Sequence, residues 1–152
     1  MPVTKRASSF MGMNKTNRLQ WPLILGLGAL ALIRPLVSIV ESQLGVTDPP
    51  AVPIIITVVI SAIWIGVVGL SRTPQPVLTL LLTGLTYAVL AIILSGILSP
   101  ILTGHLEGPL AKPFAIIPVL LTNAIWGLIA GALALLLQRA RGRRASSVHE
   151  QR

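Results

Sequence analysis

The chain has 152 residues, of which 53% are hydrophobic and only 11% charged, and its mean hydropathy is +0.84. Soluble domains carry about 25% charged residues, so this composition excludes an ordinary soluble protein. The net charge of +8 does not predict nucleic-acid binding, because the basic residues flank apolar runs and no recognition motif accompanies them. The absence of cysteine excludes disulfides, thiolate nucleophiles and thiolate metal ligands.

Four apolar runs are each long enough to cross most or all of a hydrocarbon core of about 30 Å as a helix. They predict an all-α polytopic membrane protein with four transmembrane helices arranged as two hairpins. We expect a transmembrane domain over residues 21–138, with spans at about 22–40, 53–70, 76–98 and 115–137. Residues 1–20 and 139–152 are expected to form basic tails at its two ends.

The first span follows Trp21, an amphipathic residue typical of a membrane boundary. It contains one charge, Arg34, and it is predicted to remain uncleaved because Arg34-Pro35 stands where a signal peptide would have its cleavage site. Pro35 lacks an N–H and crowds the carbonyl of Ala31, which predicts a kink. The loop 41–50 that follows carries acidic residues and no basic one.

The second span ends at a short turn, residues 71–75, which contains Arg72. The third span begins directly afterwards and is interrupted near its end by Ser99-Pro100. The start of the fourth span is left open, because Pro118 either begins the helix or kinks it.

Basic residues are distributed very unevenly between the two sides of this arrangement. Ten of them fall on the side of the termini and of Arg72, whereas the opposite side has Lys112 and three of the four acidic residues. The positive-inside rule therefore predicts a multi-pass protein of the cell (cytoplasmic) membrane with both termini cytoplasmic. Its expected partner on that side is the anionic inner leaflet of the lipid bilayer, which attracts basic segments by about 1 kcal/mol per residue.

A short motif is repeated in the second and fourth spans. Ser61-Ala62-Ile63-Trp64 is echoed by Asn123-Ala124-Ile125-Trp126. A duplication of a two-span unit would give parallel copies related by an axis along the membrane normal. Chance identity in an apolar sequence built from few residue types is the alternative, and the sequence leaves both open.

Polar residues within the spans are the candidates for function. Arg34 either extends toward the headgroups and Glu41, or binds an anion or substrate inside the bundle. Ser61, Tyr87 and Asn123 are expected near the middle of their spans. They either line a polar path or form hydrogen bonds that hold the helices together.

Small residues four positions apart allow helix backbones to approach closely, within one bundle or between protomers. Three such pairs are present in the last three spans: Ala62 with Gly66, Gly84 with Ala88, and Gly127 with Gly131. They are the candidate helix-packing residues.

Catalysis is not supported by the sequence. All acidic residues and both histidines lie outside the spans, and no catalytic or nucleotide-binding motif is present. His105 and Glu107 provide two potential metal ligands, which are too few to define a site. We therefore expect a protein that is not an enzyme and has no cofactor or metal.

The segment from Leu85-Thr86-Tyr87 through residues 99–104 to Asn123-Ala124-Ile125-Trp126-Gly127 resembles small uncharacterised four-span membrane proteins of bacteria. The resemblance covers about residues 22–138. It implies a bacterial cytoplasmic membrane and brings no activity, substrate or catalytic residue.

Two functions fit these expectations. The first is a non-enzymatic structural or accessory subunit of a membrane assembly, self-associated or bound to a larger membrane partner. The alternative is a small homo-oligomeric transporter or channel for a small solute or anion. In the alternative, Arg34 and the layer of Ser61, Tyr87 and Asn123 would face the path.

Overall fold

A computed structural model describes residues 19–45 and 51–149 of the chain. All the regular elements within these ranges are helices. In chain order they are α1 (Trp21–Leu30), α2 (Ile33–Gln43), α3 (Ala51–Leu70), α4 (Pro76–Thr103), the 3-10 helices η1 (Gly108–Leu110) and η2 (Pro113–Ala115), and α5 (Ile116–His149). The predicted N-terminal tail, except for residues 19 and 20, lies outside the described residues, as do Asp48 and Glu150.

The predicted fold class is confirmed. Four segments are long and apolar enough to cross a membrane, and they are Trp21–Gln43, Ala51–Leu70, Pro76–Thr103 and Pro113–Gly142. The first span consists of α1 and α2 together, whereas the fourth comprises η2 and most of α5.

Two helices extend beyond their predicted ends. α4 continues through Pro100 to Thr103 and ends at Gly104, which adopts the left-handed conformation with a φ of 77°. Pro100 removes one backbone donor near the end of the helix, and this does not stop the last turn. α5 continues to His149 instead of ending near residue 137, since the arginine- and alanine-rich stretch after it contains no proline and favours helix.

The predicted kink in the first span is present, and the break lies at Ala31 and Leu32, between α1 and α2. Because Pro35 has no N–H, the Ala31 carbonyl cannot accept its usual bond from residue 35. It accepts instead from the N–H of Arg34, at 3.2 Å. The tighter turn changes the direction of the chain just before Arg34.

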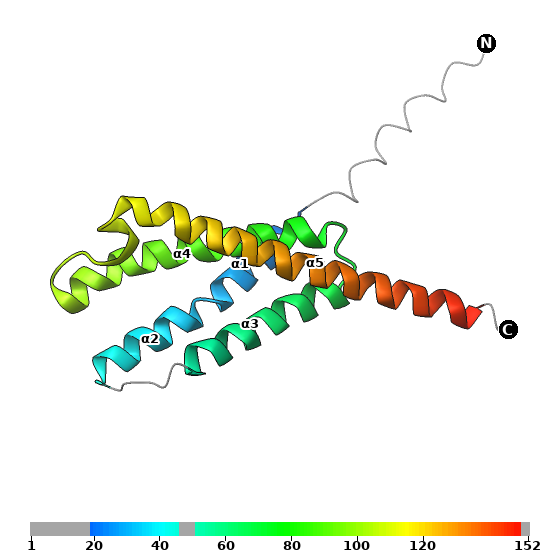
Figure 1. Ribbon diagram of the computed structural model, residues 1–152, viewed down its shortest axis with the longest axis horizontal. Helices are drawn as coiled ribbons and strands as arrows, with labels where there is room; N and C mark the ends of the chain where they lie inside the picture. The colour runs from blue at the N-terminus through cyan, green and yellow to red at the C-terminus, as the bar shows by residue number, and fades with distance from the viewer. Residues whose placement is uncertain (1–18, 46–50, 150–152) are drawn as a thin grey trace, which may run out of the picture.

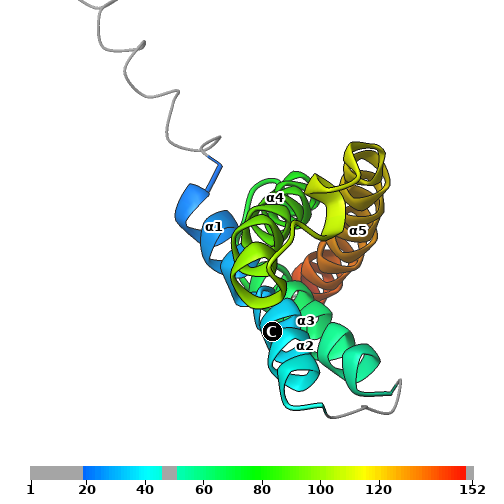
Figure 2. The same cartoon turned by 90° about the vertical axis from the view of Figure 1, so that its left-hand side faces the viewer.

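The spans form two layers that meet at one end and diverge at the other. α4 and α5 pack along each other as a close hairpin, α1 lies against α4, and α3 lies against α5. α2 and the first half of α3 lean away from the α4–α5 layer (Figure 1), and the end-on view shows the same separation (Figure 2). The second predicted hairpin is therefore tightly packed, and the first is open.

The end at which the layers meet is called the narrow end here, and the opposite one the wide end. α1 and α4 begin at the narrow end, and α3 ends there. The core cluster joins all four spans in this half, and its buried members are Leu27, Ala31, Trp64, Val68, Leu80, Ala130 and Ala134. The wide half has few buried side chains, so its geometry depends on packing in the narrow half.

Glycines bring the backbones of α4 and α5 into direct contact. A Cβ added at Gly127 would lie 2.5 Å from the carbonyl oxygen of Leu80, and one at Gly131 would lie 2.7 Å from the Cα of Val77. A Cβ at Gly84 would collide with the backbone oxygen of Asn123. Such an approach excludes any larger residue unless the two helices move apart.

Replacing Gly127 by alanine tests this contact. We expect Gly127→Ala to lower the free energy of unfolding by about 1–3 kcal/mol, since overpacking forces the backbones apart. Gly26→Ala is the matched control, because Gly26 also lies inside a helix and has no atom within 4 Å of an added Cβ. Thermal unfolding in detergent compares them, and equal midpoints for the two variants would contradict the contact.

Candidate functional site

The diverging layers enclose a pocket of about 380 Å³ that receives side chains from all four spans. All four of the predicted intramembrane polar residues line it: Arg34, Ser61, Tyr87 and Asn123. Thr57 and Thr122 add two hydroxyls to the lining, and Thr122 was not predicted from the sequence. The rest of the lining is aliphatic and aromatic, which is typical of a ligand site with a few orienting polar groups.

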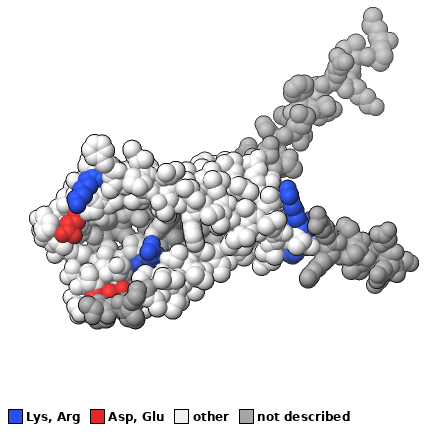
Figure 3. Space-filling model, viewed as in Figure 1, with Lys and Arg blue, Asp and Glu red and all other residues white. Residues whose placement is uncertain are grey.

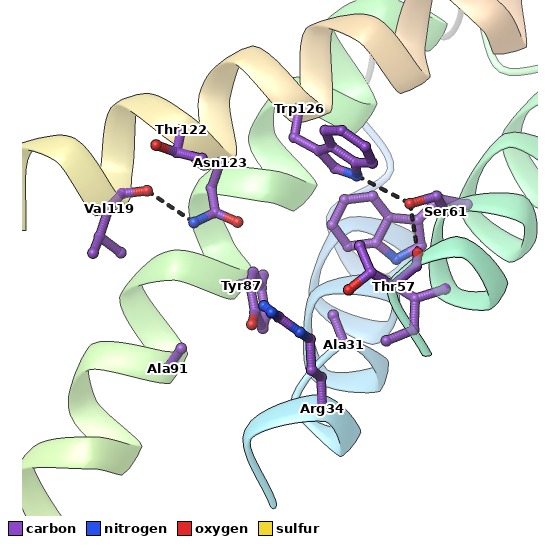
Figure 4. A pocket seen from close by; sticks show the side chains of 12 residues that line it. Ala31, Arg34, Thr57, Ser61, Tyr87, Ala91, Val119, Thr122, Asn123 and Trp126 are labelled. Carbon is purple, nitrogen blue, oxygen red and sulfur yellow. Dashed lines mark hydrogen bonds between the residues drawn. The ribbon is translucent and has the colours of Figure 1, made fainter. Parts of the chain in front are cut away.

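Arg34 owes its position to the break between α1 and α2. It lies thirteen residues after Trp21, or about 20 Å along the span at 1.5 Å per residue, which places it in the half of the membrane near the wide end. Its side chain extends toward Tyr87 across the pocket (Figure 4). No hydrogen bond or ion pair joins the guanidinium to another residue in the described part of the chain.

One wall of the pocket is held by a chain of hydrogen bonds between α5 and α3. The Trp126 indole Nε1–H donates to Ser61 Oγ at 3.0 Å, and Ser61 Oγ donates to the Thr57 carbonyl at 2.7 Å (Figure 4). This bond lies in the wide half, where few other contacts join the layers. Ser61 therefore acts both as part of the lining and as a link between spans.

The two tryptophans of the repeated motif have different roles. Trp64 is buried, with 3% of its surface exposed, and its Nε1–H donates to the Leu27 carbonyl at 3.1 Å, which ties α3 to α1. Trp126 is 44% exposed and borders the pocket. The motif thus occupies unlike environments in its two occurrences, and a duplication remains a prediction.

Asn123 and Tyr87 complete the polar layer from the α4–α5 hairpin. The Asn123 amide Nδ2–H donates to the Val119 carbonyl at 2.8 Å, one turn earlier in the same helix. This bond fixes the amide beside the pocket, whereas the Asn123 backbone is pressed against Gly84. Tyr87, on α4, lies opposite Arg34 in the same pocket.

A second pocket, of about 270 Å³, lies between α2 and α3 and shares Arg34 and Tyr87 with the first. Ser38 and Glu41 also line it, and Glu41 is near the end of α2. The two pockets therefore meet at Arg34 and lead from the middle of the spans toward the wide end.

The narrow end is closed by side chains of α5 that bind the end of α3. Gln138 Nε2–H donates to the carbonyls of Val68 at 2.9 Å, Ser71 at 3.0 Å and Thr73 at 3.3 Å. Arg141 donates to the Leu70 carbonyl at 2.8 Å. These bonds satisfy backbone carbonyls that have no partner within the helix end and the turn. The sequence did not predict them, because Gln138 and Arg141 lie beyond the span end predicted near residue 137.

The predicted packing residues divide into two groups. Gly84, Ala88, Gly127 and Gly131 lie buried within the bundle. Ala62 is exposed, and an added Cβ at Gly66 would meet nothing within 4 Å. The Ala62–Gly66 pair therefore does not contribute to packing within this chain.

The described acidic side chains lie at the wide end, whereas basic ones occur at both ends. Glu41, Glu107 and Lys112 belong to the end of α2 and the connection between α4 and α5, and Arg72, Arg139 and Arg141 belong to the turn after α3 and the later part of α5. Figure 3 shows red at the wide end only, and blue at both ends and between them. His105 Nε2 lies 2.9 Å from Glu107 Oε1 on the exposed loop after α4. Within the described ranges no group of three or more potential metal ligands occurs.

Comparisons of this chain with protein families, with curated proteins and with solved structures find no match. The pocket and its residues therefore carry the functional argument.

The Ser61–Trp126 hydrogen bond can be measured with a double-mutant cycle of Ser61→Ala and Trp126→Phe. We expect a coupling free energy of about 0.6–1.7 kcal/mol, the range measured for hydrogen bonds between membrane helices. Reversible unfolding in mixed micelles provides the four stabilities. Trp21→Phe paired with Ser61→Ala is the control and should show additive effects, because Trp21 begins α1 at the narrow end, away from Ser61. Equal coupling in both cycles would contradict the assignment.

Proposed function

We propose that this protein is a non-enzymatic transporter or channel subunit that binds an anionic ligand in the pocket around Arg34. The observation that carries the proposal is an arginine at membrane depth facing a pocket lined by polar groups of all four spans. This is the second of the two functions considered from the sequence. The pocket favours it over a purely structural role, because interhelical hydrogen bonds alone do not require an arginine.

Energetics support a negatively charged ligand. An arginine near the centre of a span costs about 2.5–3.5 kcal/mol on insertion scales. An anion bound to the guanidinium would offset this cost, since hydrogen bonds to charged groups contribute about 1.5–3 kcal/mol. The Tyr87 hydroxyl and the second N–H of the Asn123 amide, in the same lining, supply further donors for the remaining oxygens of the anion.

The proposed location is the cytoplasmic membrane of a bacterium, with both termini cytoplasmic and the narrow end facing the cytoplasm. The orientation is supported by the basic residues, which gather at the termini and at Arg72. The bacterial membrane is proposed from the resemblance of the spans to four-span proteins of bacteria. In this orientation the pocket opens toward the outer side. The anionic inner leaflet would bind the basic segments.

The orientation can be tested by thiol labelling, because the chain has no cysteine of its own. We expect a membrane-impermeant maleimide to label His105→Cys in intact spheroplasts. Pro74→Cys, in the exposed turn after α3, should react only after permeabilisation. Labelling of Pro74→Cys in intact spheroplasts would contradict the orientation.

The ligand site can be tested by native mass spectrometry of protein in lipid nanodiscs. We expect the wild type to retain an anionic molecule. Arg34→Gln should bind it with an affinity at least about tenfold lower, because a charge-assisted hydrogen bond is lost. Arg72→Gln is the control, since Arg72 is exposed in a turn at the narrow end. Equal retention by all three proteins would contradict a site at Arg34.

The structural or accessory subunit stays the second candidate, and one observation favours it. Ala62 and Gly66 lie on an uncovered part of α3, where a helix of another protein or of a second copy has room to approach. In the same mass spectra, a stoichiometric complex with a different membrane protein and no bound anion would support this function.

A further inference from the structure

We infer that the anion at Arg34 belongs to a lipid, which enters sideways from the leaflet at the wide end. The inference rests on the proposed anion site and adds the class of its ligand. A phosphate or carboxylate headgroup would contact Arg34, while an acyl chain would occupy the gap between the α2–α3 layer and the α4–α5 layer.

The first support is the lateral opening of the gap. α2 has no buried residue, the buried residues of α3 begin at Trp64, and those of α4 end at Ile92. The two layers therefore do not cover each other in the wide half, as their divergence shows (Figure 1). In a membrane, such a gap is bordered by lipid instead of water, so a lipid reaches the pocket without crossing a protein barrier.

The second support is the chemistry of the lining. Beside Arg34 the pockets present aliphatic surface from both layers, including Ile60, Ala91 and Val119 in the first, and Val37 and Ile56 in the second. A hydrated inorganic anion loses water when it enters such a lining, whereas an acyl chain passes from the bilayer into equally apolar surroundings without that cost. A single cation with a few polar groups among largely apolar walls thus matches an amphiphile better than a free ion.

The third support is depth. Arg34 lies about 20 Å from the Trp21 boundary, and hence about 10 Å inside the other face of a core of about 30 Å. The long arginine side chain extends its charge toward the headgroups. A headgroup therefore needs to move only part of the distance between the membrane face and Arg34 to reach the guanidinium. The two alternatives for Arg34, extension toward lipid phosphate and anion binding in the bundle, then describe the same contact.

Tryptophan fluorescence provides the test, because the three tryptophans have distinct surroundings. Trp126 borders the pocket at 44% exposure, Trp21 is 54% exposed at the narrow-end boundary, and Trp64 is 3% exposed. The protein is reconstituted in phosphatidylcholine vesicles containing phosphatidylglycerol brominated in its acyl chains, or the same fraction of brominated phosphatidylcholine. The difference between wild type and Trp126→Phe isolates the quenching of Trp126.

We expect the anionic brominated lipid to quench Trp126 with about tenfold higher apparent affinity than the zwitterionic one. Arg34→Gln should abolish this preference, whereas Arg72→Gln should retain it. Neither substitution should change the quenching of Trp21. Millimolar inorganic phosphate should not relieve the quenching of Trp126.

Three results would overturn the inference. Protection of Trp126 by inorganic phosphate, dependent on Arg34 and without lipid preference, would identify a soluble anion and leave the proposed function standing. A lipid-free dimer in native mass spectra, together with no quenching of Trp126 by either brominated lipid, would show that a second copy fills the gap. No dependence on Arg34 in either the lipid or the phosphate measurement would remove the proposed anion site as well.

Discussion

The backbone contact between α4 and α5 is the constraint on which the rest of the structure depends. In lipid the hydrophobic effect does not favour association of these helices, so they associate through close packing and hydrogen bonds. Gly84, Gly127 and Gly131 provide the close packing. Once this hairpin is formed, α1 and α3 each have a surface to pack against, and Gln138 fixes the end of α3 to α5.

The concentration of packing in the narrow half has a direct consequence for the wide half. Two layers joined at one end, with a break at Ala31 in the first span, separate toward the other end. The resulting space is a pocket between the layers that is open at its sides and is bordered by the charge of Arg34.

The number of membrane spans and their helical type follow directly from the sequence, because a long run of apolar residues predicts insertion into lipid whatever its tertiary contacts. The polar layer was also predictable: counting residues from the span ends places Ser61, Tyr87 and Asn123 near the middle of their spans, and they line one pocket together with Arg34. Which small residues pack was not predictable. Gly66 and Gly127 have the same local signature, and only the helix arrangement buries one and leaves the other open.

Residues missed from the sequence share a physical reason. Thr122 resembles any hydroxyl on a membrane helix, and nothing local shows that it faces the same space as residues of the other spans. Gln138 lies one residue beyond the predicted span, where a polar residue is ordinary, yet it binds three carbonyls from the end of α3 and the turn after it. In a four-span protein the polar groups at depth are few, so the same residues link the helices and form the site. Ser61, which accepts from Trp126 while lining the pocket, shows why a change in ligand binding and a change in stability must be measured separately.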